Sequence, residues 1–114
     1  MNIDDYTFGK IIVDGHTYTA DVIITPERVT DGWWRKEGHR LDESDLDEII
    51  RANPDCLLVG TGYFGRMKIP LETIQYLQTK NIHLEYAPTK DAIGKLDQLQ
   101  KQYARIVTAL HLTC

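Results

Sequence analysis

Asp55-Cys56-Leu57-Leu58-Val59-Gly60-Thr61-Gly62-Tyr63-Phe64-Gly65-Arg66 is the stretch of this 114-residue chain that decides its fold. Its first half is a short apolar run, which predicts a strand in a buried sheet. The three glycines that follow have the spacing G-x-G-x-x-G. Such a turn lets main-chain N–H groups approach a ligand or a neighbouring chain without side chains in the way. The stretch therefore predicts a candidate pocket at the end of a buried strand, without indicating a reaction.

The segments around this stretch alternate between helix and strand patterns. The expected elements are a helix over 43–53, a strand over 56–60, a helix from Pro70, a strand over 82–86, a helix capped by Thr89 and a strand over 105–110. Strands that alternate with helices imply parallel pairing with right-handed crossovers. We therefore predict a single three-layer α/β domain over residues 1–114, with a central mixed, largely parallel sheet and flanking helices.

The amino-terminal third predicts a β-hairpin beside this sheet. Residues 6–25 alternate in hydrophobicity, and Asp14-Gly15 supplies the left-handed positions of a type I′ turn. Pro26 ends the second strand because it cannot donate to a strand ladder. Residues 27–41 keep no clear period, so we expect irregular structure or short edge strands there.

Composition narrows the choice of partners and compartment. The net charge of −4 and the isoelectric point near 5.5 disfavour binding to nucleic acid or to an anionic membrane. No apolar run approaches the ~20 residues that span a bilayer, and the acidic start of the chain lacks the pattern of a signal peptide. We expect a cytoplasmic protein whose partners are neither nucleic acids nor membranes.

The glycine-rich turn has two interpretations. Gly60, Gly62 and Gly65 match a dinucleotide fingerprint, but 66–69 separate the third glycine from the expected helix start, and the chain has room for only one of the two halves that bind a dinucleotide. No cofactor is therefore expected. A small carboxylate or phosphate remains a candidate ligand, and its candidate binding residues are Gly60, Thr61, Gly62, Gly65, Arg66 and Thr89. The alternative is that the glycines only form a tight turn and that Thr89 only caps a helix.

The ligand interpretation depends on free main-chain donors. It predicts that the amides between Val59 and Met67 stay open at the rim of the sheet. It also requires that the strands over 56–60 and 82–86 are neighbours, since ligands in open α/β sheets collect beyond the carboxyl ends of strands.

Trp33-Trp34 lies in the most basic part of an acidic chain. Aromatic residues among cations are typical of surfaces that hold a partner protein, so Trp33, Trp34 and Arg35 are a candidate partner interface. The alternative is that one indole covers the core and that the other lies under arginine stems.

Signals for catalysis or metal binding are missing. The four histidines share no metal-ligand spacing, and the two cysteines form no disulfide framework. No catalytic signature occurs, so we predict no catalytic residue and no metal site, and the sequence favours a protein that is not an enzyme.

The order of several landmarks resembles that of a known family. They are Leu57-Leu58-Val59-Gly60-Thr61-Gly62, Ile69-Pro70, Ala87-Pro88-Thr89 with Ala92, and the closing Thr108-Ala109-Leu110-His111-Leu112-Thr113-Cys114. They resemble the Mth-type domain family of unknown function. Its relatives include an adipogenesis-associated animal protein and a mitochondrial assembly factor for respiratory complex I.

The resemblance implies a layered α/β fold and a non-catalytic interaction role. The leading hypothesis is an uncharacterised binding or assembly module with a protein partner, and a homodimer is compatible with its edge strands. The alternative is a small anionic ligand or an enzymatic pocket at the Gly60-Thr61-Gly62 turn.

Overall fold

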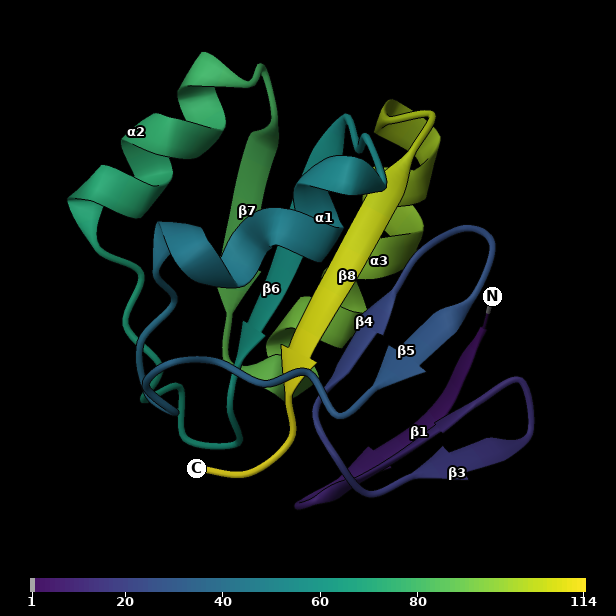
Figure 1. The fold of residues 1–114 in the computed structure, drawn as a ribbon. Helices are drawn as coiled ribbons and strands as arrows, with labels where there is room; N and C mark the ends of the chain where they lie inside the picture. Colours follow the sequence, from purple (N-terminus) through teal and green to yellow (C-terminus); the bar gives the residue numbers. More distant parts are fainter. Residues whose placement is uncertain (1) are drawn as a thin grey trace.

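Two sheets organise the chain in the computed structural model, which describes residues 2–114 (Figure 1). The larger sheet has five strands in the order β5-β4-β8-β6-β7. These strands are β4 (Val22–Ile24), β5 (Val29–Asp31), β6 (Cys56–Thr61), β7 (His83–Ala87) and β8 (Ile106–His111). β6 pairs in parallel with both β7 and β8, whereas β4 pairs antiparallel with β8 and β5. The predicted mixed, largely parallel sheet is confirmed.

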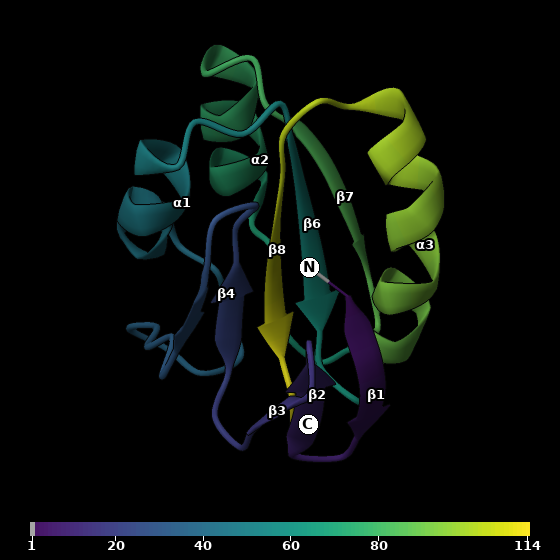
Figure 2. The same ribbon diagram turned by 90° about the vertical axis from the view of Figure 1, so that its right-hand side faces the viewer.

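Different elements cover the two faces of this sheet, which gives three layers (Figure 2). The 3₁₀ helix η1 (Glu43–Leu46), α1 (Asp47–Arg51) and α2 (Leu71–Thr79) cover one face, and α3 (Thr89–Gln102) covers the other. A three-stranded antiparallel sheet packs beside α3. Its strands are β1 (Ile3–Thr7), β2 (Lys10–Val13) and β3 (His16–Tyr18). No helix within residues 2–114 has the length and apolar character needed to cross a membrane.

The apolar run after Asp55 lies at the centre of the protein, as expected. All six residues of β6 are buried, and the same holds for β8. Alternate side chains of β6 serve different layers: Leu57 and Val59 pack toward η1, α1 and α2, and Leu58 packs against α3. Each buried aliphatic side chain of this size contributes about 1.5–3 kcal/mol, so this strand anchors both helical layers.

The amino-terminal hairpin differs from its prediction. Asp14 (φ 49°) and Gly15 (φ 80°) do form a left-handed two-residue turn, but it joins β2 to β3 only. The chain then leaves the small sheet after Tyr18, and Val22–Ile24 pairs with β8 of the large sheet. The predicted first strand, which began at residue 6, is divided by a turn at residues 8–9 into the end of an additional strand, β1, and its antiparallel partner β2. Hydrophobic residues alternate from 18 to 24 whether these residues form one strand or two. The pattern therefore could not reveal that residues 16–18 join the small sheet and residues 22–24 the large one.

Two smaller predictions concern residues 27–53, and the structure confirms one of them and shortens the other. Residues 27–41 contain one short edge strand, β5, and are otherwise irregular, as expected. The predicted helix over 43–53 is shorter, because it consists of η1 and α1 and ends at Arg51. Asn53 has a φ of 54°, and this left-handed residue directly after the C-cap ends the helix and turns the chain toward β6.

Candidate functional site

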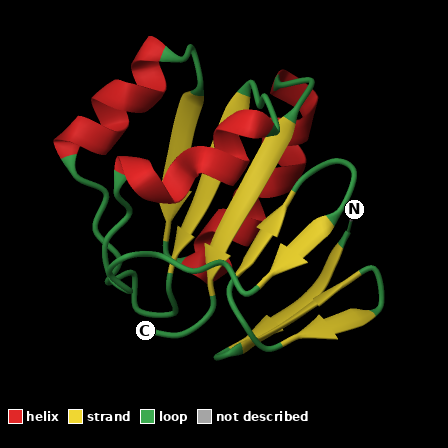
Figure 3. Cartoon of the chain, viewed as in Figure 1, coloured by secondary structure: helices red, strands yellow, loops and turns green. Residues whose placement is uncertain are grey.

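The carboxyl ends of β6, β7 and β8 lie at one edge of the molecule (Figure 1). The loop after β6, the segment after β8 and the β1–β2 turn gather at the same edge, and loops dominate it (Figure 3). The prediction that the strands at 56–60 and 82–86 are parallel neighbours is confirmed by β6 and β7. Since ligands of α/β sheets bind at such edges, a ligand site is expected at this edge.

Most main-chain donors of the glycine-rich turn are used inside the protein. The amide of Gly62 donates to Thr89 Oγ1 at 2.9 Å, and that of Tyr63 donates to the Thr113 carbonyl at 2.7 Å. The amides of Gly65 and Met67 donate to carbonyls within the turn, at 3.1 and 3.0 Å. The prediction of open amides is therefore wrong at these four positions. The physical reason is that α3 and the segment after β8 supply two of the acceptors, and the turn itself supplies the other two.

Close approach within the chain explains each glycine of the fingerprint. A Cβ at Gly60 would lie 2.8 Å from Thr89 Oγ1, and one at Gly65 would lie 3.0 Å from Pro88. A Cβ at Gly62 would lie 2.7 Å from the Cys114 carbonyl oxygen. The glycines thus let α3 and the carboxy-terminal segment approach β6, as the interpretation of a tight turn requires.

The other candidate ligand residues differ in their exposure and in their hydrogen bonds. Thr61 and Thr89 are buried, and the Thr89 hydroxyl donates to the His111 carbonyl at 2.6 Å. Thr89 caps no helix, because Pro88 precedes the first turn of α3 without a side-chain cap. Arg66 is exposed, with its guanidinium 5.5 Å from the ring centre of Phe64. Anion binding at this turn stays a prediction, and the internal hydrogen bonds argue against it.

A largely buried ionic cluster lies beneath the same edge, and no sequence pattern predicted it. Asp21 precedes β4, Arg35 follows β5 and His111 ends β8. Asp21 Oδ2 lies 2.8 Å from Arg35 Nη2 and 2.7 Å from His111 Nδ1. Asp21 Oδ1 accepts the Leu112 amide at 2.8 Å. Because an ionised carboxylate can only accept hydrogen bonds, His111 Nδ1 carries a proton. Arg35 and His111 therefore both donate to Asp21 Oδ2.

The cluster favours the ionised carboxylate. Burial alone raises the pKa of Asp21, but hydrogen bonds from His111, the Leu112 amide and Arg35 outweigh it, so its pKa lies below the ordinary value. Two buried atoms of the cluster, Arg35 Nη1 and His111 Nε2, have no hydrogen-bond partner among residues 2–114. No local spacing could have revealed this contact, because 90 positions separate Asp21 from His111.

Exposed aromatic side chains gather beside the glycine-rich turn, and they were not among the predicted site residues. Phe8, Tyr63 and Phe64 are 53%, 48% and 60% exposed. The ring centres of Phe8 and Tyr63 are 5.5 Å apart, and those of Tyr63 and Phe64 are 5.0 Å apart. We call these three residues the aromatic patch. The signal was present, because Tyr63-Phe64 lies between Gly62 and Gly65 in a predicted turn, and turns run over the protein surface.

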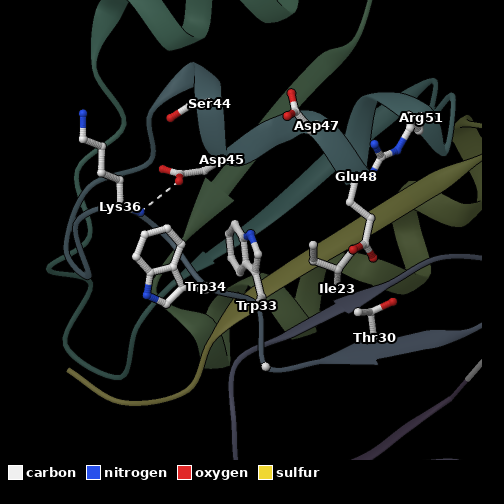
Figure 4. A pocket seen from close by; sticks show the side chains of 11 residues that line it. Ile23, Thr30, Trp33, Trp34, Lys36, Ser44, Asp45, Asp47, Glu48 and Arg51 are labelled. Carbon is white, nitrogen blue, oxygen red and sulfur yellow. Dashed lines mark hydrogen bonds between the residues drawn. The ribbon is translucent and has the colours of Figure 1, made fainter.

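The two tryptophans have opposite environments. Trp33 is buried, with the Arg35 guanidinium 4.6 Å from its ring centre, and Trp34 is 78% exposed. Of the predicted partner interface, only Trp34 therefore reaches the surface, since Arg35 is buried in its ion pair with Asp21. Both indoles line a groove of about 510 Å³ between β4–β5 and α1, which we call the tryptophan groove (Figure 4).

The two cysteines are expected to react very differently. Burial, with Glu85 and Asp55 nearby, raises the pKa of the Cys56 thiol to about 11. Cys114 is partly exposed, 3.9 Å from His39 Nε2. Since the thiolate is the nucleophile, iodoacetamide should label the folded protein once, at Cys114, and label both thiols only in denaturant. Peptide mass spectrometry measures this, and equal labelling of Cys56 in the folded protein would show that β6 opens readily.

Comparisons with solved structures agree with this fold. The conserved hypothetical protein PH1505 from Pyrococcus horikoshii OT3 is 28% identical, with a TM-score of 0.84 and full coverage of both chains. The Rpa2829 protein from Rhodopseudomonas palustris is 26% identical over 96% of this chain and 81% of its own, with a TM-score of 0.76. A Bordetella pertussis protein described as a Mth938-like domain is 19% identical over 97% of this chain and 85% of its own, with a TM-score of 0.72, and supports the fold alone.

A family model agrees with these structures and with the resemblance found in the sequence. The model described as protein of unknown function (DUF498/DUF598) matches residues 3–111. The chain therefore belongs to this family, and its structure is of the Mth938-like type.

Proposed function

We propose that this protein is a non-catalytic binding module that docks a partner protein through the aromatic patch. The observation that carries the proposal is the clustering of Phe8, Tyr63 and Phe64 in two turns at the loop-rich edge, where their rings contact one another while facing solvent. Clusters of exposed aromatic side chains are typical of protein interfaces and of their energetically dominant residues.

Charge at the rim of the patch suggests the chemistry of the partner. Arg66 lies over the Phe64 ring and forms no ion pair within residues 2–114. A guanidinium beside an apolar patch favours a partner that presents an apolar side chain flanked by a carboxylate. The buried Asp21–Arg35–His111 cluster beneath the edge would hold the loops in place rather than contact the partner.

Truncation of the patch is expected to weaken capture of the partner. Phe8→Ala and Phe64→Ala should each weaken binding about 30-fold, which corresponds to about 2 kcal/mol at a central interface residue. The immobilised protein and each variant are incubated with an extract of the native host, and the retained proteins are compared by quantitative mass spectrometry. The affinity of each retained protein is then measured by calorimetry.

The matched control is Leu71→Ala. Leu71 is an exposed apolar residue at the start of α2, outside the patch, and its truncation should leave binding unchanged. Light scattering of each variant shows whether the partner is a second copy of this chain. If Phe8→Ala and Phe64→Ala retain the same proteins and the same oligomeric state as the wild type, the proposed function is wrong.

A further inference from the structure

The tryptophan groove is a second surface, with chemistry that the aromatic patch lacks. It lies between the β4–β5 edge, the segment after β5 and α1, and its volume of about 510 Å³ falls within the usual range of ligand sites. Figure 4 shows the Trp33 indole in its wall, beside Ile23, and the Trp34 ring at its mouth. One wall is thus apolar and aromatic, and the opposite wall is the acidic start of α1.

Two buried atoms of the groove lining lack hydrogen-bond partners within residues 2–114. They are Trp33 Nε1, which can only donate, and Glu48 Oε2, which accepts when ionised. In the view of Figure 4 the Trp33 nitrogen is on the edge of the ring that is turned toward Glu48. A buried indole N–H usually finds an acceptor, so these atoms point to a ligand that supplies both an acceptor and a donor.

The carboxylates of the groove are free to attract a cation. Asp45, Asp47 and Glu48 line it together with two cations, Lys36 and Arg51. None of these five side chains forms an ion pair in the part of the chain that the structure describes. The Asp45 carboxylate accepts hydrogen bonds only from main-chain amides, one of them that of Lys36. The Lys36 ammonium extends away from the indoles (Figure 4). The groove lining therefore has one more carboxylate than cation, and its carboxylates are not held in ion pairs within residues 2–114.

The Trp34 ring adds a site for a cation. One face of Trp33 already carries the Arg35 guanidinium at 4.6 Å, but Trp34 is 78% exposed and has no cation–π contact within residues 2–114. A lysine or arginine side chain over an open indole gains a cation–π interaction in addition to its attraction to nearby carboxylates.

We infer that the tryptophan groove binds a basic segment of another polypeptide. A lysine or arginine of that segment crosses the Trp34 ring and donates to Glu48, with Asp47 nearby, and a main-chain carbonyl of the same segment accepts from Trp33 Nε1. Rotation of the partly exposed Glu48 side chain brings its carboxylate to the ligand. The inference uses none of the residues of the aromatic patch and stands independently of the proposed function.

Tryptophan fluorescence tests this directly, because both tryptophans of the chain line the groove. The probe is an acetylated, amidated hexapeptide of alternating glycine and lysine, and the control peptide has glutamate in place of lysine. We expect a saturable change in emission with the lysine peptide at millimolar concentrations, weakened by added salt, and none with the glutamate peptide. Equal responses to both peptides, or no response to either, would overturn the inference.

Variants separate this site from nonspecific attraction to an acidic protein. Glu48→Gln should weaken binding of the lysine peptide about tenfold, as expected for loss of a charge-assisted hydrogen bond. Arg51→Gln should strengthen binding about twofold, because it removes the competing cation. Glu43→Gln is the matched control, since Glu43 is exposed on η1 but does not line the groove.

The outcomes also distinguish this inference from the proposed function. Phe64→Ala should leave the fluorescence titration unchanged, and Glu48→Gln should leave partner capture through the aromatic patch unchanged. If Glu43→Gln lowers the affinity as much as Glu48→Gln does, the attraction is nonspecific and the inference is wrong.

Discussion

Asp21→Asn is expected to lower the free energy of unfolding by about 3 kcal/mol, because it leaves the buried Arg35 guanidinium without its counter-ion. The side chains of Arg35 and Asp21 are only 3% and 15% exposed, so solvent replaces little of the lost interaction. The substituted amide would still accept the Leu112 N–H, but it would offer no charge to either Arg35 or His111. A loss of this size lowers the melting temperature of a domain of this length by about 10 °C.

The pH dependence identifies the charge as the cause. The pKa of Asp21 is lowered in the folded protein, by hydrogen bonds that outweigh its burial. A carboxyl with a lowered folded pKa contributes stability above its unfolded pKa of about 3.9 and loses it as the pH falls toward the folded pKa. The difference in stability between wild type and Asp21→Asn should therefore shrink as the pH falls below about 4.

Urea denaturation at several pH values measures both effects. Asp97→Asn is the control for loss of one carboxylate, because Asp97 is exposed on α3, and its effect should stay within about 0.5 kcal/mol. Arg35→Met in the Asp21→Asn background should recover part of the lost stability, since no unpaired buried charge remains. A stability difference that persists unchanged at low pH would show that shape, not charge, makes Asp21 important.

The core elements of the fold were predictable because local patterns determine them. The run from Cys56 to Gly60 is apolar without alternation, as a strand covered on both faces must be. In the helical segments on either side of it, apolar residues recur at the helical period. Asp14-Gly15 specified its turn through two left-handed residues. These signals depend on residues within a few positions of one another, so one sequence sufficed to interpret them.

The remaining features depend on contacts between distant positions. Asp21 lies at the point where the chain passes from the small sheet to the large one, and its partners are Arg35 and residues 111–112. Nothing near Asp21 in the sequence records those partners. The glycine spacing wrongly suggested a ligand site for the same reason. A bound ligand and a packed segment of the same chain both need a residue without a Cβ, so the spacing cannot tell them apart. Only the positions of Pro88-Thr89 and Thr113-Cys114 in the folded chain distinguish them.

Gly62→Ala is expected to destabilise the protein by about 3–4 kcal/mol, through backbone strain and steric conflict together. Gly62 has a φ of 108°, which side-chain-bearing residues rarely adopt. A Cβ would also lie 2.7 Å from the Cys114 carbonyl and 2.8 Å from the Thr113 carbonyl. Relief of that conflict requires the segment after β8 to move, which would break the 2.7 Å hydrogen bond from the Tyr63 amide to Thr113.

Two other glycines separate the two causes, since a Cβ at either would meet no atom within 4 Å apart from its chain neighbours and, in α3, the backbone of its own helix. Gly15→Ala adds only left-handed strain, because its φ is 80°, and should cost about 1 kcal/mol. Gly94→Ala lies within α3 and should stabilise the protein by about 0.5–1 kcal/mol. Thermal unfolding of the three variants gives the comparison. If Gly62→Ala costs no more than Gly15→Ala, the carboxy-terminal segment yields freely, and the glycine-rich turn has room for something other than its own chain.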